Sequence, residues 1–362
     1  MSTALARTDN RHPMQMQLDI MAGDDESLDV SFMSRAFCLA GMPLRKQYQR
    51  DKLTRKTLEP QREITTFSRS DEQFALTISG SEVTLPGDDG RGLPVLLQTG
   101  VPYGAKARLL ILWMTTQARL NPSSRWLEIG KIDTFLEEIG VQPHPEASAS
   151  VKDQLVRLTF SLFTMVLKDQ QQRHYFQRDM LISSSVFPEE DLSHYAAGEL
   201  AKVRFPLGIE LSQVAHDRFS SNDSIPISTE SLRKISSSAL AIDIYLYLCY
   251  RLPLLSHGES QLLTWKKLIK LFGNNEKQSK FRQTFDSSIT KALDAYQGAN
   301  VDLTDEGLLL RYSDPAVLRK LFVANPQRKT VQGPQRVRNR IAPPPEAVIP
   351  PRPPGKQLIL GV

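Results

Sequence analysis

One order of predicted secondary-structure elements occurs twice in this chain, and it constrains the fold more than any other feature. Hydrophobic periodicity predicts a helix over residues 102–119, then the apolar stretch WLEIG, a short helix ending at Gly140, a longer helix over residues 150–167 and a hairpin. The second half repeats this order with QLLTW, a short helix ending at Gly273, a helix over residues 279–296 and another hairpin. Helix, strand, two helices and hairpin is the order of a winged-helix domain. We therefore expect an α+β fold, mainly helical, with two tandem winged-helix domains related by an internal repeat.

Composition divides the chain further into a folded middle and two tails. The last 39 residues hold nine of the 23 prolines. Proline removes backbone hydrogen-bond donors, and this segment also has little apolar surface to bury. We expect a mobile N-terminal tail over 1–30, a small region with a strand pair over 31–92, the first winged-helix domain over 93–200, the second over 201–323, and a proline-rich basic disordered tail over 324–362.

The small N-terminal region has signals for one helix and two strands. Its start predicts a helix near residues 31–39. Phe74, Leu76 and Ile78 alternate with polar residues, which is typical of a strand with one buried face. The glycine within residues 79–81 indicates a turn beside that strand.

The formal charge is distributed unevenly along the chain. The whole chain carries +5, whereas residues 324–362 hold seven basic residues and one acidic residue and so carry +6. The preceding 323 residues are therefore close to −1. Any surface for nucleic acid on the folded part must be local rather than spread over it.

The third helix of each predicted winged-helix domain has an apolar stripe with a polar, partly basic side opposite. Lysine and arginine neutralise phosphates, and arginine and glutamine also pair with base edges in the major groove. An ordinary amphipathic surface helix has the same composition, and the residues alone leave both readings open. On the DNA-binding reading, the first domain would contact DNA through Lys152, Gln154, Arg157, Ser161, Lys168 and Arg173, and the second through Lys280, Arg282, Gln283, Ser287 and Lys291.

Motifs for catalysis, metal binding and nucleotide binding do not emerge from the sequence. In GVPYGAK only three residues separate the glycines, and Ala105 precedes Lys106, so the spacing is not that of a phosphate-binding Walker loop. The six histidines lack the paired spacing that a metal-dependent DNA-nicking enzyme would need, and Cys38 and Cys249 are too far apart for a zinc motif. We expect a non-enzymatic protein without a cofactor or metal.

The compartment is predicted from what the sequence lacks. The first residues have no apolar core of the kind that a signal peptide needs. The longest aliphatic run, near residues 109–114, is too short to span a membrane. We expect a soluble cytoplasmic protein.

The segment LPVLLQTGVPYGAKARLLILWMTTQAR, followed by LEIGKIDTFLEEIGV, resembles the RepA-type plasmid replication initiators of bacteria. The resemblance extends from about residue 93 to residue 312 and is generic in its second half. The residues that match the family's pattern are Pro102, Tyr103, Gly104, Arg108, Leu109, Leu110, Leu112, Trp113, Thr116, Ala118, Phe135, Leu136, Ile139 and Gly140.

This resemblance implies a protein that binds direct repeats (iterons) in a plasmid origin, opens nearby AT-rich DNA and recruits the host helicase and initiator. Such proteins often repress their own promoter and exist as monomers and homodimers. Lys106 and Arg108 would then contact DNA phosphate at the start of the first helix. The alternative is a winged-helix transcriptional repressor without melting activity.

Overall fold

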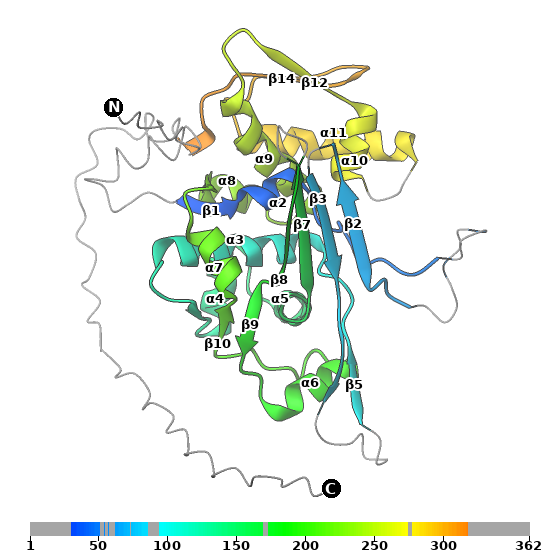
Figure 1. Ribbon diagram of the computed structural model, residues 1–362, viewed down its shortest axis with the longest axis vertical. Coiled ribbons are helices and arrows are strands. Elements are labelled where there is room, and N and C mark those ends of the chain that lie inside the picture. The colour runs from blue at the N-terminus through cyan, green and yellow to red at the C-terminus, as the bar shows by residue number, and fades with distance from the viewer. Residues whose placement is uncertain are drawn as a thin grey trace, which may run out of the picture. The chain divides into compact units, whose positions relative to one another are not determined.

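Two buried helices pack against each other within the core of the structure, a computed structural model (Figure 1). They are α3 (Gly104–Leu120) and α9 (Ala239–Arg251), the first helices of the two copies of the repeated order, of which the second begins near Ser238. Apolar residues cover most of the circumference of α9, as expected of a helix that is buried on nearly all sides. The side-chain hydroxyl of Ser238 accepts a hydrogen bond from the amide of Ala241 and caps its N-terminus.

The structure describes residues 30–50, 54, 57, 62–72, 74–85, 94–168, 173–273 and 277–317. The described residues belong to one unit, and its main hydrophobic core includes side chains from both predicted domains. Residues 1–29 of the predicted mobile tail over 1–30, and all of the predicted proline-rich tail over 324–362, lie outside the described residues, whereas Val30 begins a strand.

The second copy of the repeat has every predicted element. After α9 come β12 (Ser260–Thr264), α10 (Trp265–Phe272), α11 (Gln278–Ala295), β13 (Val301–Leu303) and β14 (Gly307–Arg311). The three strands form an antiparallel sheet in the order β12-β14-β13, so the strand between the first two helices pairs with the hairpin. The predicted helix over 279–296 is confirmed to within one residue at each end.

The first copy has the same order of elements but a different sheet. After α3 come β6 (Trp126–Glu128), α4 (Ile132–Glu138), α5 (Pro145–Thr159), β7 (Leu162–Lys168) and β8 (His174–Met180). Strand β6 pairs with β10 (Gly208–Leu211). Strands β7 and β8 belong to a separate sheet with β2 (Thr66–Ser70) and β3 (Phe74–Ser79), in the order β2-β3-β7-β8. The sheet pairing of the second copy is therefore not repeated here.

The predicted helix over 150–167 is misplaced at both ends. Helix α5 begins five residues earlier, because Pro145 suits the first helical turn and a ring nitrogen of His144 accepts a hydrogen bond from the amide of Ala147. It ends at Thr159, and the following apolar run forms β7. Ser161 therefore lies after the helix, and Lys168 lies on a strand.

The N-terminal region joins several sheets. Residues 30–34 form β1 (Val30–Ser34), and helix α2 (Arg35–Leu39) follows, so the predicted helix over 31–39 is wrong in its first half. The alternating strand is confirmed as β3 (Phe74–Ser79), which pairs with β2 (Thr66–Ser70). The turn over 79–81 joins β3 to β4 (Glu82–Leu85) of another sheet. The remaining elements are β5 (Val95–Gln98), β9 (Ile182–Ser185), α6 (Glu189–Ala196), α7 (Gln213–Ser220), β11 (Ser224–Ser228), α8 (Thr229–Ile235) and the 3-10 helix η1 (Leu252–Leu254).

Candidate nucleic-acid interface

Helix α11 has one stripe of side chains that is open to solvent. Lys280, Gln283, Ser287 and Lys291 are exposed and recur at helical spacing. Phe281, Phe285 and Ile289 face the core instead, and none is more than 3% exposed. The polar side predicted for this helix is therefore present as an accessible surface.

Aromatic packing fixes α11 against α10. The ring of Trp265 meets Phe285 edge-on with centroids 5.7 Å apart, and Phe281 and Phe285 lie 5.4 Å apart. Tyr247 of α9 and Phe272 of α10 form a further edge-on pair at 5.6 Å. Burial of these rings provides a rigid base for the exposed stripe.

The hairpin β13–β14 is tied to the same two helices. The indole Nε1 of Trp265 donates to the carbonyl of Asp305 at 2.9 Å, and Arg282 Nη2 donates to the same oxygen at 3.2 Å. The guanidinium of Arg282 also stacks over the Trp265 ring, 4.5 Å from its centroid. Of the five predicted contacts on α11, Arg282 is thus committed to holding the hairpin.

Positive charge is concentrated on this helix pair. Between Trp265 and Tyr296 the sequence has seven basic residues and three acidic ones, a net formal charge of +4 on a body that is close to −1. In the part of the chain that the structure describes, no salt bridge involves the lysines of α10 or α11. Their charges remain available to an anionic partner.

The sequence analysis missed four lysines of this cluster. Lys266, Lys267 and Lys270 lie on α10, and Lys277 directly precedes α11. Lys266, Lys270 and Lys277 are exposed, and Lys267 is half-buried. The spacing in WKKLIK was sufficient to find the three lysines on α10, because they alternate with the apolar residues that begin with Trp265 and Leu268.

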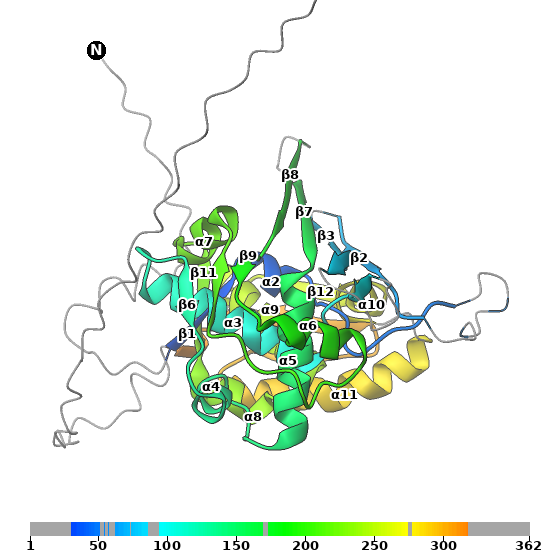
Figure 2. The ribbon, with the colours of Figure 1, turned by 90° about the horizontal axis from the view of Figure 1, so that it is seen from below.

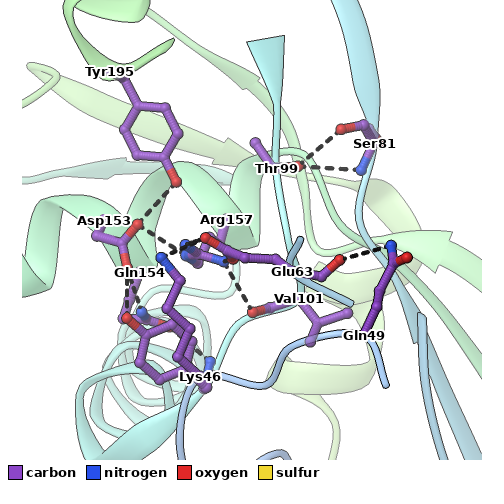
Figure 3. A network of polar contacts seen from close by, with 11 residues as sticks. Lys46, Gln49, Glu63, Ser81, Thr99, Val101, Asp153, Gln154, Arg157 and Tyr195 are labelled. Atoms are coloured by element: carbon purple, nitrogen blue, oxygen red, sulfur yellow. Dashed lines mark hydrogen bonds and ion pairs between the residues drawn. The ribbon is translucent and has the colours of Figure 1, made fainter. Parts of the chain in front are cut away.

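Helix α5 of the first copy is covered, contrary to expectation. Gln154 is 1% exposed, Arg157 is 4% exposed and Ser161 is fully buried. The segment around Glu63 and helix α6 pack over the side of α5 that was predicted to face solvent (Figure 3). The prediction that these three residues lie on an accessible face is therefore wrong.

Arg157 is the centre of a buried polar network (Figure 3). Its Nε donates to Asp153 Oδ1 at 2.8 Å, and its Nη1 donates to Glu63 Oε2 at 2.7 Å. The hydroxyl of Tyr195 on α6 donates to Asp153 Oδ1 at 2.9 Å, and Gln154 Nε2 donates to Asp153 Oδ2 at 2.8 Å. Two carboxylates thus face one guanidinium, and Arg157 forms ion pairs within the fold rather than an accessible contact.

The network shifts the pKa values of its members. Burial and the nearby Asp153 carboxylate raise the pKa of Tyr103 to about 12 and raise that of Tyr195 further. Burial alone would lower the pKa of Arg157, but its hydrogen bonds with Glu63 and the charge of Asp153 raise it above the ordinary value. All three groups therefore keep their protons at neutral pH.

The other predicted contacts of the first copy lie in varied surroundings. Arg108 is 2% exposed and paired with Asp243, so its predicted accessibility is also wrong. Lys106 and Lys152 are half-buried, and burial lowers the pKa of each. Lys152 lies over the ring of Phe205 at 5.7 Å.

The remaining two predicted contacts lie on the hairpin β7–β8. Lys168 ends β7 and is half-buried, whereas Arg173 precedes β8 and is exposed. The guanidinium of Arg173 lies 5.8 Å from the centroid of the Tyr175 ring. Their hairpin belongs to the sheet β2-β3-β7-β8, whereas the hairpin beside α11 belongs to the sheet β12-β14-β13.

The described residues contain no group of three or more His, Cys, Asp or Glu side chains that could hold a metal ion. Among the helices described, none is long and apolar enough to cross a membrane.

Part of this chain is similar to proteins of a known family. Residues 101–267 match the family model described as "Plasmid encoded RepA protein", a segment that ends within α10 and so precedes α11. Among curated proteins no sequence matches the chain. A crystal structure of a selenomethionine derivative of domains 2 and 3 of RctB matches with 13% identity and a TM-score of 0.45, over 76% of this chain and 95% of that chain.

A second crystal structure of RctB domains 2–3 matches with 11% identity and the same TM-score, over 78% of this chain and 98% of that chain. The family match covers the PYG segment and the helix ending at Gly140, on which the resemblance was based. Residues 101–267, a little less than half of the chain, are thus similar to plasmid-encoded RepA proteins.

Proposed function

We propose that this protein is a plasmid replication initiator that binds duplex DNA of its origin through α11. The observation that carries the proposal is the exposed stripe of Lys280, Gln283, Ser287 and Lys291, in a helix pair whose sequence has a net formal charge of +4. Such a stripe can donate hydrogen bonds to phosphates and base edges together. The family of residues 101–267 supports the role.

The second copy serves in this proposal as a winged-helix domain. Its sheet order β12-β14-β13 and its two helices α10 and α11 match that arrangement. Helix α11 has 18 residues, which at 1.5 Å per residue gives about 27 Å, long enough to lie in a major groove. The amide of Gln283 is suited to adenine, and the lysines to phosphate.

The two predicted domains, 93–200 and 201–323, have different roles in this scheme. We assign duplex binding to the second domain, because its helix α11 is exposed to solvent. The first domain supports that helix. The finer steps belong to the same proposal: binding of direct repeats, melting of adjacent AT-rich DNA, contact with the host helicase and initiator, and exchange between monomer and homodimer. Binding energy rather than a covalent step drives the melting.

Footprinting on the DNA that flanks the gene tests this proposal. The protein should protect tandem repeats from nuclease and make thymines in a neighbouring AT-rich segment reactive to permanganate. Protection of repeats without permanganate reactivity would favour the alternative, a repressor without melting activity. Failure to protect any flanking repeat would contradict both.

A further inference from the structure

The sheet β2-β3-β7-β8 has one buried face and one open face. Phe67, Phe74, Leu76, Ile78 and Phe163 alternate along three strands and lie in the core. The side chains between them point to the other face, where every described residue is half-buried or exposed. We call this second face the open sheet face.

Hydroxyl groups dominate strands β2, β3 and β7 of the open sheet face. The side chains that carry these hydroxyl groups are not among the buried residues of the core, so no described helix covers this part of the face. The side chains are Thr66, Ser68, Ser70, Thr77, Ser79 and Thr164.

Two aromatic rings extend the open sheet face along β8. The side chain of Phe176 is 74% exposed, although burying such a ring would be favourable by about 2 kcal/mol. The ring of His174 lies beside it on the same face, with centroids 6.5 Å apart. The hairpin β7–β8 projects from the rest of the protein (Figure 2). The side chains of His174 and Phe176 are both exposed to solvent.

The charged groups on the open sheet face are all basic. In the register of β7 and β8, Lys168 lies opposite His174 and Thr164 lies opposite Arg178. Lys168 and Arg178 therefore lie on either side of Phe176 on the same face. No carboxylate residue lies at a position of this face. Within the described chain neither Lys168 nor Arg178 forms a salt bridge.

We propose that the open sheet face binds single-stranded DNA, with bases stacked on Phe176 and His174 and phosphates at Lys168 and Arg178. Unpaired bases stack on exposed aromatic rings, whereas the bases of a duplex have their faces covered. The acid-free surface complements a phosphodiester chain, and hydroxyl groups supply further hydrogen bonds. The inference rests on the proposed function, because melting of the origin would release the strand.

Fluorescence anisotropy with the full chain and a labelled oligothymidylate of about 20 nucleotides tests the inference. Phe176→Ala should weaken binding about tenfold, because one stacked base is lost. Phe176→Trp should retain it. Tyr175→Ala is the matched control, since Tyr175 is a 53% exposed ring on the opposite face of the same strand. It should leave the affinity unchanged.

The charges are tested by salt dependence. The double variant Lys168→Gln with Arg178→Gln should reduce the slope of log affinity against log salt by about 1.4, from about 0.7 for each phosphate contact. An unchanged slope in the double variant would contradict the assignment of the phosphates.

Phe176 is too exposed to support the core, so circular dichroism and the melting temperature of Phe176→Ala should match the wild type.

Duplex binding distinguishes this inference from the proposed function. Lys280→Ala with Lys291→Ala should weaken duplex binding and leave oligothymidylate binding intact. If that variant lost single-strand binding while Phe176→Ala retained it, the open sheet face would be the wrong site. If Phe176→Ala bound oligothymidylate normally and changed only the oligomeric state, the face would belong to a protein contact and the inference would fail.

Discussion

Arg108 and Asp243 form a buried, two-pronged ion pair between the two central helices. Arg108 Nε donates to Oδ1 of Asp243 and Nη2 donates to Oδ2, both at 2.6 Å, and the side chains are 2% and 3% exposed. Arg108 also donates to the carbonyls of Met42, Pro43 and Gly104. One guanidinium thus connects α3, α9 and the segment after α2.

Replacing Asp243 with Ala should destabilise the fold by about 3–5 kcal/mol, because it leaves a buried guanidinium without its carboxylate. Arg69 lies in the same cluster, where burial lowers its pKa to about 10 and Asp243 opposes that effect. Urea unfolding gives the free-energy change. Asp302→Ala is the control: its pair with Arg311 is exposed, and its loss should cost below about 1 kcal/mol. Equal losses would show that the buried pair has no special role.

Arg157→Ala should lower the melting temperature without changing the affinity of the folded protein for duplex DNA. The substitution removes the cation that pairs with buried Asp153 and leaves Glu63 paired with Lys46 alone, at a cost of about 3–5 kcal/mol. Thermal unfolding and anisotropy measured below the transition separate the two effects. A loss of DNA affinity in folded Arg157→Ala would restore α5 as a DNA-reading helix.

Acid should weaken the fold through Glu63. Burial alone would raise the pKa of this carboxyl, but hydrogen bonds from Arg157 and Lys46 outweigh it and hold the pKa below its ordinary value. A carboxyl with a lowered folded pKa contributes stability that is complete above the unfolded pKa, about 4.3, and is lost as pH falls through the folded value. The free energy of unfolding should therefore decline below about pH 4.3.

Glu63→Gln should remove part of this decline. Its deficit relative to the wild type should be largest near neutral pH and should shrink as the pH falls below about 4.3. Exposed Glu72→Gln serves as the control and should follow the wild-type profile. Parallel profiles for Glu63→Gln and wild type, with a constant deficit, would contradict the assignment.

Gly307 at the start of β14 should not tolerate a side chain. Its φ is +151°, and a Cβ there would lie 2.1 Å from the carbonyl oxygen of Leu263 on β12. Gly307→Ala should therefore cost more than the roughly 1 kcal/mol of an unfavourable backbone conformation alone. Gly258→Ala isolates that smaller term, because Gly258 has φ +86° and open space around it. Calorimetry of both variants would show equal losses if the close approach were unimportant.

Local patterns predicted most of the elements of the second copy. The helical spacing of Phe281, Phe285 and Ile289 marks the buried side of α11, and the same spacing leaves Lys280 and Lys291 outside. Periodicity reports which side of a helix is apolar, and here the opposite side meets only solvent. The candidate interface on α11 followed for that reason.

Long-range packing explains what the sequence did not predict. Gln154 and Arg157 are polar, and their pattern on α5 is that of a surface helix. Glu63 and Tyr195, distant in sequence, cover that side and supply hydrogen bonds that satisfy it. A polar residue with buried partners and one in water look alike in a single sequence.

The sequence also did not predict which strand β6 pairs with. The apolar residues of WLEIG predict a strand, and β6 forms there, but its partner is β10, about 80 residues further along the chain. No local signal distinguishes this partner from the hairpin β7–β8. Strand register and partner choice depend on the packed faces rather than on the strand itself.

The measurement that tests the central claim most directly is the salt dependence of duplex binding by Lys280→Ala with Lys291→Ala, with exposed Lys131→Ala as the matched control. For two lost phosphate contacts, the slope of log affinity against log salt should fall by about 1.8, with at least about tenfold weaker binding to the origin repeats. Lys131→Ala should match the wild type, and all variants should keep the wild-type melting temperature. Wild-type affinity and slope in the double variant would show that α11 does not bind the origin.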